Sequence, residues 1–117
     1  MAAFNTVTKE VGIVSLIGIS GYYNEDGGRE LRRTVEGILR SGKNRIVVNF
    51  ANCTGINSPG VAVMIELAVL ITEDFRGKMV LCGLDELKKK VFNLAGILGL
   101  AQVAVGETQA AEVAGAE

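Results

Sequence analysis

The sequence predicts an α/β fold, with a mostly parallel central sheet, an antiparallel N-terminal strand and about four helices. Short apolar segments alternate along the chain with segments whose apolar residues recur at helical spacing. Residues 45–50 are apolar almost throughout, as in a strand that is covered on both faces. The length of 117 residues suits a single domain, residues 1–117, with a core that needs neither disulfides nor metal.

The first three elements are bounded by clear signals. Phe4 to Thr8 alternates like a strand, and a turn near Glu10–Gly12 precedes a strongly apolar strand over 13–19. Apolar residues then recur at helical spacing from Leu31 to Leu39, with arginines mostly on the other side. We expect this helix to stop at Ser41-Gly42, because glycine suits the left-handed residue after a helix.

The rest of the chain continues the alternation. We expect strands over 45–50, 77–82 and 101–105, and helices over 59–71, 85–94 and 108–113. In the helix over 85–94, the run Lys88-Lys89-Lys90 is expected to be solvated, and Gly96 suits a left-handed cap after it. The residues expected to face inward are Leu84, Leu87, Val91 and Leu94.

The helix over 59–71 is apolar on more than one side. An ordinary surface helix has a single apolar stripe, so this helix is either buried or covered by a partner, and the sequence leaves both possibilities open. Its two stripes are Val61, Ile65 and Ala68, and Val63, Leu67, Leu70 and Ile71.

One serine stands between the strand over 45–50 and this helix. Pro59 disfavours helical dihedrals at Ser58, and proline is favoured at the first helical position. We therefore expect Ser58 to be the N-cap, followed by Pro59 and Gly60 in the first turn. A helix N-terminus also favours anions, so the serine hydroxyl is a plausible place for a phosphate.

The chain from Arg45 to Val105 resembles a STAS domain, the fold of bacterial anti-sigma factor antagonists. In that family a buried strand leads into a loop with Asp-Ser-Ser/Thr-Gly, then a helix, a strand, a second helix and a last strand. The matching segments are Ile46–Phe50, Asn57–Gly60, Lys78–Cys82 and Val91–Ile97, together with an upstream strand that ends in glycine, Val11–Gly21.

The resemblance implies a binding module in partner-switching regulation. The unmodified chain would bind an anti-sigma factor or serine kinase, and phosphorylation of Ser58 would abolish that binding. The partner-binding residues that it implies are Asn57, Ser58, Pro59, Gly60, Val61 and Met64. Where the family usually has Asp, this chain has Asn57, which removes a negative charge beside the hydroxyl.

Composition excludes several other classes of function. The chain has no histidine, so there is no Ser-His-Asp arrangement, and we expect no catalytic residue, no metal site and no cofactor. A formal net charge of −1 with interspersed signs argues against nucleic-acid binding. No signal peptide or membrane-inserting segment is evident, so the protein is expected to be cytoplasmic.

Two alternatives stay open. The chain could be a STAS scaffold subunit of a larger regulatory or lipid-transport complex, without phosphorylation, and could form a homo-oligomer through the helix over 61–71. It could also be an enzyme with Ser58 as the nucleophile, although only a lysine or a carboxylate could then serve as its base.

Overall fold

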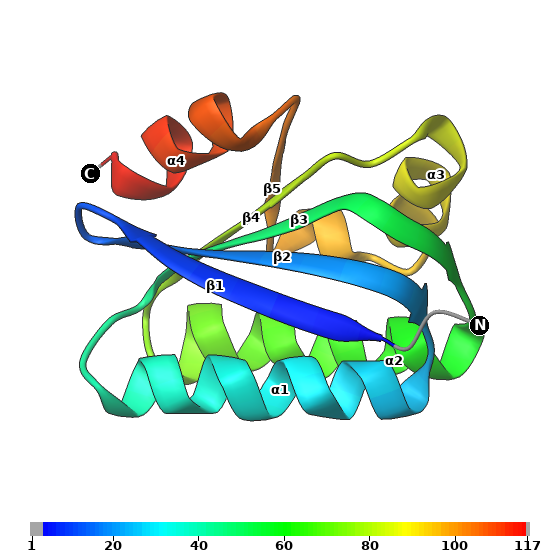
Figure 1. Ribbon diagram of the computed structural model, residues 1–117, viewed down its shortest axis with the longest axis horizontal. Coiled ribbons are helices and arrows are strands. Elements are labelled where there is room, and N and C mark those ends of the chain that lie inside the picture. Colours follow the sequence, from blue (N-terminus) through cyan, green and yellow to red (C-terminus); the bar gives the residue numbers. More distant parts are fainter. Residues whose placement is uncertain (1–3, 117) are drawn as a thin grey trace.

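A five-stranded sheet forms the centre of the molecule, with helices on both faces (Figure 1). The computed structural model describes residues 4–116. The strands lie in chain order, the first two pair antiparallel, and the other neighbours pair parallel. They are β1 (Asn5–Val11), β2 (Val14–Tyr23), β3 (Arg45–Ile56), β4 (Lys78–Cys82) and β5 (Gln102–Ala104). The predicted fold class is therefore confirmed.

The helices divide unequally between the two faces of the sheet. They are α1 (Glu25–Arg40), α2 (Ser58–Val69), which continues into the π-helical turn η1 (Leu70–Asp74), α3 (Glu86–Leu94), the 3-10 turn η2 (Ile97–Gly99) and α4 (Glu107–Gly115). In Figure 1, α1 and α2 run side by side on one face, and α4 crosses the opposite face. No helix within residues 4–116 is long and apolar enough to cross a membrane.

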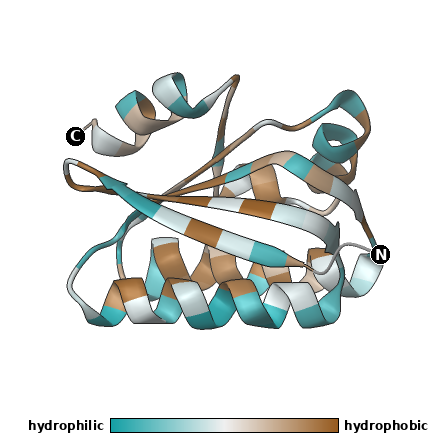
Figure 2. Cartoon of the chain, viewed as in Figure 1, coloured by the Kyte–Doolittle hydropathy of each residue, from teal (hydrophilic) through white to brown (hydrophobic). Residues whose placement is uncertain are grey.

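Side chains of β3 alternate between two cores. Ile46 and Val48 enter the larger core against α1 and α2, whereas Val47 enters the smaller core beneath α4. Figure 2 shows that α1 is hydrophobic toward the sheet and hydrophilic on its outer side, whereas α2 is hydrophobic along most of its length. Because both faces of the strand are covered here, the run Ile46–Val48 contains no polar residue.

Two glycines end elements as expected. Gly42 follows α1 with φ of 94°, and Gly96 follows α3 with φ of 84°. Residues with a side chain rarely adopt this left-handed backbone conformation, which glycine reaches without a steric penalty.

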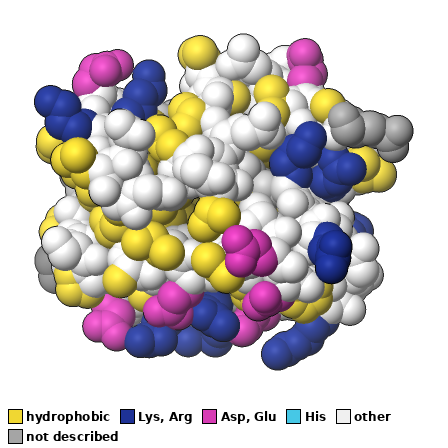
Figure 3. Space-filling model, turned by 180° about the vertical axis from the view of Figure 1, so that it is seen from behind, with side chains coloured by type: hydrophobic (Ala, Val, Ile, Leu, Met, Phe, Trp, Pro, Cys, Tyr) yellow, Lys and Arg dark blue, Asp and Glu magenta, His cyan; other side chains and the backbone are white. Residues whose placement is uncertain are grey.

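The helix α2 is largely buried, because α1 and the sheet cover both of its apolar stripes. Met64, Leu67 and Ile71 are inaccessible to solvent, and Arg32 of α1 pairs with Glu66 at 2.8 Å. The molecule as a whole still exposes some apolar surface, because the face opposite to that in Figure 1 carries hydrophobic side chains over its middle part (Figure 3). Burial therefore accounts for most of the apolar character of α2, and a homo-oligomer through 61–71 stays a prediction.

The orientation of α3 differs from the expected one. Leu87 and Leu94 are 71% and 81% exposed, so the expectation that they face inward is wrong. Phe92 is instead fully buried, with its ring centroid 5.4 Å from that of Phe50 and the two rings at 68°. Burying the Phe92 ring edge to face against Phe50 stabilises the fold more than burying Leu87 and Leu94 would.

Lys88 lies on the buried side of α3, although the sequence predicted that it would be solvated. It is only 8% exposed, and its Nζ lies 2.8 Å from Oδ2 of Asp85. A lysine can bury its aliphatic stem while its ammonium group stays paired near the surface. Asp85 is also the N-cap of α3, because its Oδ1 accepts a hydrogen bond from the Lys88 N–H at 2.8 Å.

Candidate functional site

The loop that carries Ser58 is tied to the end of the neighbouring strand. β3 continues to Ile56 rather than ending at Phe50, because its pairing with β2 runs on past two irregularities in register as far as Tyr23. The Asn57 N–H then donates to the Tyr23 carbonyl oxygen at 3.2 Å. The chain therefore enters α2 from a strand end that is held in place.

Asn57, and not Ser58, is the N-cap of α2. Its backbone is extended, with φ of −124° and ψ of 170°, and its Oδ1 accepts a hydrogen bond from the Gly60 N–H at 3.0 Å. Ser58 is already the first helical residue, so the expectation that it caps the helix is wrong. Asparagine is as good a cap as serine, and Pro59 fits the first turn because it needs no acceptor there.

The six residues expected to bind a partner differ in accessibility. Ser58 and Pro59 are exposed and Asn57 is half-buried, so these three form the outer surface of the loop. Gly60, Val61 and Met64 are buried. A partner could therefore reach these three residues little or not at all in this conformation.

Tyr23 supports the loop from below, a role that the sequence pattern does not indicate. Its ring is fully buried between Phe4 and Phe50, with centroid distances of 5.9 and 6.2 Å. A Cβ atom on Gly60 would lie 2.9 Å from both the Cδ2 atom and the carbonyl oxygen of Tyr23. Only glycine lets the first turn of α2 approach the strand so closely.

The Tyr23 hydroxyl is buried and, within residues 4–116, has no hydrogen-bond partner. Burial raises the pKa of Tyr23 well above its usual value, and the nearby Cys53 and Glu66 raise it further. Gly28 of α1 leaves room for the hydroxyl, which would lie 3.0 Å from a Cβ atom at that position. The group thus stays protonated and serves as part of the packing.

The first turns of α1 and α2 differ in charge. The first turn of α2 has no acidic residue, whereas the first turn of α1 carries Glu25 and Asp26. The partial positive charge at the start of α2 favours an anion beside Ser58. Within residues 4–116 no cluster of Cys, Asp and Glu side chains could hold a metal ion, and the chain contains no histidine.

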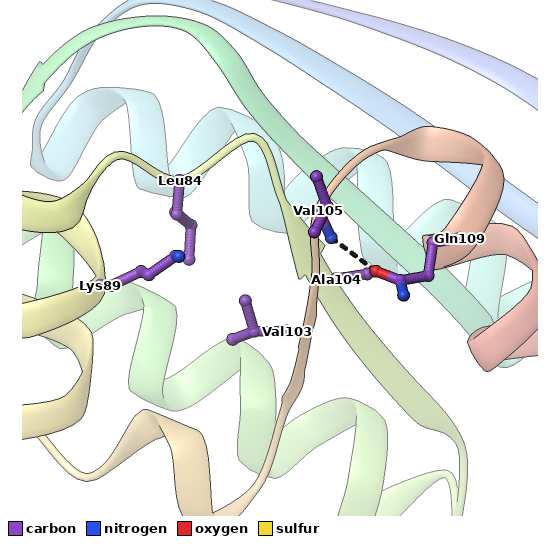
Figure 4. Close-up of a pocket in the computed structure, with 6 residues that line it drawn as sticks. All are labelled: Leu84, Lys89, Val103, Ala104, Val105 and Gln109. Atoms are coloured by element: carbon purple, nitrogen blue, oxygen red, sulfur yellow. Dashed lines mark hydrogen bonds between the residues drawn. The ribbon is translucent and has the colours of Figure 1, made fainter.

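A hollow of about 250 Å³ lies between α3 and β5, away from the serine loop (Figure 4). Leu84, Lys89 and Val103 line one side, and on the other side the Val105 N–H donates to Gln109 Oε1 at 2.8 Å. Among the described residues that line the hollow, Lys89 alone is charged, and convergent polar groups like those of a small-molecule site are lacking there.

We predict that Asn57→Ala lowers the free energy of unfolding by roughly 0.5–2 kcal/mol, because the Gly60 N–H loses its acceptor. Ser58→Ala should change it by less than about 0.5 kcal/mol, as for an ordinary surface substitution. Urea denaturation of the two variants beside the wild type measures the difference. If Ser58→Ala lowered the free energy of unfolding more than Asn57→Ala, the assignment of Asn57 as the cap would be contradicted.

No family model and no curated protein matches this chain. The anti-sigma factor antagonist SpoIIAA in its unphosphorylated form is similar, with 19% identity, 97% of this chain and 100% of that chain covered, and a TM-score of 0.73. The phosphorylated form of the Bacillus cell fate determinant SpoIIAA gives 20% identity, 95% and 99% coverage, and a TM-score of 0.70.

Two further solved structures show how widely this fold is used. An anti-sigma factor antagonist from Mycobacterium paratuberculosis is 11% identical over 96% of this chain and 94% of that chain, with a TM-score of 0.81. The murine anion transporter Slc26a9 is 13% identical over 93% of this chain but only 19% of its own, with a TM-score of 0.73. At such identities the likeness establishes the fold, and the STAS-type fold that the sequence predicts is confirmed.

Proposed function

We propose, from its STAS-type fold, that this chain is an anti-sigma factor antagonist. It would bind an anti-sigma factor or serine kinase through the loop at Asn57–Gly60, and phosphorylation of Ser58 would switch that binding off. The observation that carries the proposal is the exposed Ser58 at the start of α2, in a loop whose cap is supplied by Asn57. The serine hydroxyl is therefore free to be modified without loss of the helix cap.

The switch needs no change of fold. A phosphate adds a charge of about −1.5 to −2 and three acceptor oxygens at the surface of the loop. A partner surface shaped for a neutral hydroxyl would have to desolvate or repel that charge. A penalty of about 3 kcal/mol already lowers affinity by roughly a hundredfold. The start of α2 stabilises the phosphate within the chain itself, so modification should not unfold it.

Phosphorylation and binding assays test the proposal together. Incubation with the cognate anti-sigma kinase and ATP should add one phosphate, which mass spectrometry places on Ser58. Ser58→Asp should weaken kinase binding by at least about tenfold, or about 1.4 kcal/mol, because it adds negative charge to the loop. Ser58→Ala is the matched control, which should bind normally and take no phosphate.

Asn57 provides a second variant for the same assay. Asn57→Asp restores the carboxylate usual in the resembling family and keeps an oxygen that can cap α2. Faster phosphorylation of this variant would show that the missing charge limits the reaction. If neither the wild type nor Asn57→Asp takes up phosphate, the proposed phosphorylation switch at Ser58 is wrong.

A non-phosphorylated scaffold is the second candidate. In the Slc26a9 anion transporter the similar part makes up 19% of the chain, so this fold occurs there within a longer protein. Asn57 in place of an acidic residue also suits a role without phosphorylation. In that case a charge at the half-buried Val69 of α2 should reduce oligomer size, measured by sedimentation, in a chain that kinase and ATP leave unmodified.

A further inference from the structure

The outer edge of β1 has no neighbouring strand within residues 4–116. β1 is the first strand in the sheet order, and it pairs only with β2 (Figure 1). All of its residues except Thr6 are exposed, and Val7 and Val11 are 64% and 45% exposed. Its register with β2 is continuous, so no bulge twists this edge away from a partner, and it contains no proline.

The turn after β1 determines which backbone groups point outward. Gly12 and Ile13 form a two-residue hairpin loop, in which Gly12 has φ of 60°. In such a hairpin the closing pair, Val11 and Val14, is hydrogen-bonded, and bonded pairs alternate along the strand. The backbone N–H and C=O groups of Thr6, Thr8 and Glu10 therefore point away from β2.

The charges on β1 select among the possible pairings with a second copy. If two β1 strands paired antiparallel about a twofold axis at Lys9 or Glu10, like charges would lie directly opposite each other, which is destabilising. An axis at Thr8 places Thr6 opposite Glu10 and Val7 opposite Lys9, and it pairs the whole strand with itself. Lys9 and Glu10 are also neutralised within the chain, by Glu107 at 3.1 Å and Lys43 at 2.9 Å.

From this self-complementary edge, we infer that two copies of this chain associate through antiparallel pairing of their β1 strands, about a twofold axis at Thr8. The pairing satisfies the outward backbone groups of Thr6, Thr8 and Glu10, and it joins the two sheets into one. It covers part of the exposed Val7 with the stem of Lys9 from the second copy. The serine loop lies between β3 and α2, outside this edge, so dimerisation and the proposed switch can be tested separately.

Sedimentation equilibrium of the purified wild type, over about a hundredfold range of concentration, should show a reversible dimer. Thr8→Lys and Thr8→Glu each place like charges on the axis. Each alone should raise the dimer dissociation constant by about tenfold or more. An equimolar mixture of the two should again dimerise, because the pair on the axis is then oppositely charged.

Thr8→Ser is the matched control, since it keeps the exposed hydroxyl and adds no charge, and it should dimerise like the wild type. Circular dichroism establishes that each variant is folded. A wild type that remains monomeric at the highest concentration would overturn the inference. So would a dimer that both charged variants retain, or two monomeric variants that fail to associate when mixed.

Discussion

Phe92→Ala should lower the free energy of unfolding by about 3–5 kcal/mol, the usual loss for a buried aromatic side chain. The Phe92 ring is fully buried and meets Phe50 edge to face, and Phe50 in turn contacts Tyr23. The substitution would leave a cavity at one end of this aromatic row and would also remove the ring–ring interaction. Urea denaturation, followed by circular dichroism, measures the loss.

Leu94→Ala is the matched control on the same helix. Leu94 is 81% exposed, so its truncation should change the free energy of unfolding by less than about 0.5 kcal/mol. The comparison tests the orientation of α3 directly, because the sequence pattern alone predicted Leu94 to be buried. A loss for Leu94→Ala that equals the loss for Phe92→Ala would contradict the orientation of α3 described above.

Gly60→Ala should lower the free energy of unfolding by about 1–3 kcal/mol, as for other overpacked positions. The added Cβ atom would lie 2.9 Å from the Tyr23 carbonyl oxygen, which cannot move without shifting β2. That oxygen also accepts the Asn57 N–H, so the strain should reach the serine loop. Thermal denaturation measures the stability, and the kinase assay with ATP should show slower modification of Ser58 in this variant.

Gly37→Ala is the control for the general effect of replacing a helical glycine. A Cβ atom on Gly37 would meet no atom within 4 Å, and the residue lies inside α1. Alanine should therefore raise the free energy of unfolding by roughly 0.5–1 kcal/mol, since glycine is a poor helix former. If Gly60→Ala were as stable as Gly37→Ala, the proposal that Tyr23 supports the loop would be contradicted.

The accessibility of Ser58 and the burial of its surroundings have one physical origin. Strand β3 delivers the chain to the surface at Asn57, whereas Gly60 brings α2 back against Tyr23. Between these two contacts only Ser58 and Pro59 are exposed. The proposed kinase or binding partner would thus meet a short, well-supported segment, and binding would cost little conformational entropy in the loop.

Local signals in the sequence determined the order and type of the elements. The apolar run from Ile46 to Val48 identified a strand covered on both faces, and Gly42 and Gly96 marked the ends of α1 and α3. These signals depend on the periodicity and backbone preferences of neighbouring residues, which operate within one element. The same local reasoning located the serine at the junction of a strand and a helix.

Only the tertiary structure decided the details that set the site and the surfaces. Asn57 rather than Ser58 caps α2, because β3 pairs with β2 as far as Tyr23. That register depends on residues far apart in sequence. The orientation of α3 was decided by the space beside Phe50, which Phe92 fills. Burial depends on which element lies opposite a side chain, and hydrophobic periodicity says only that some face is covered.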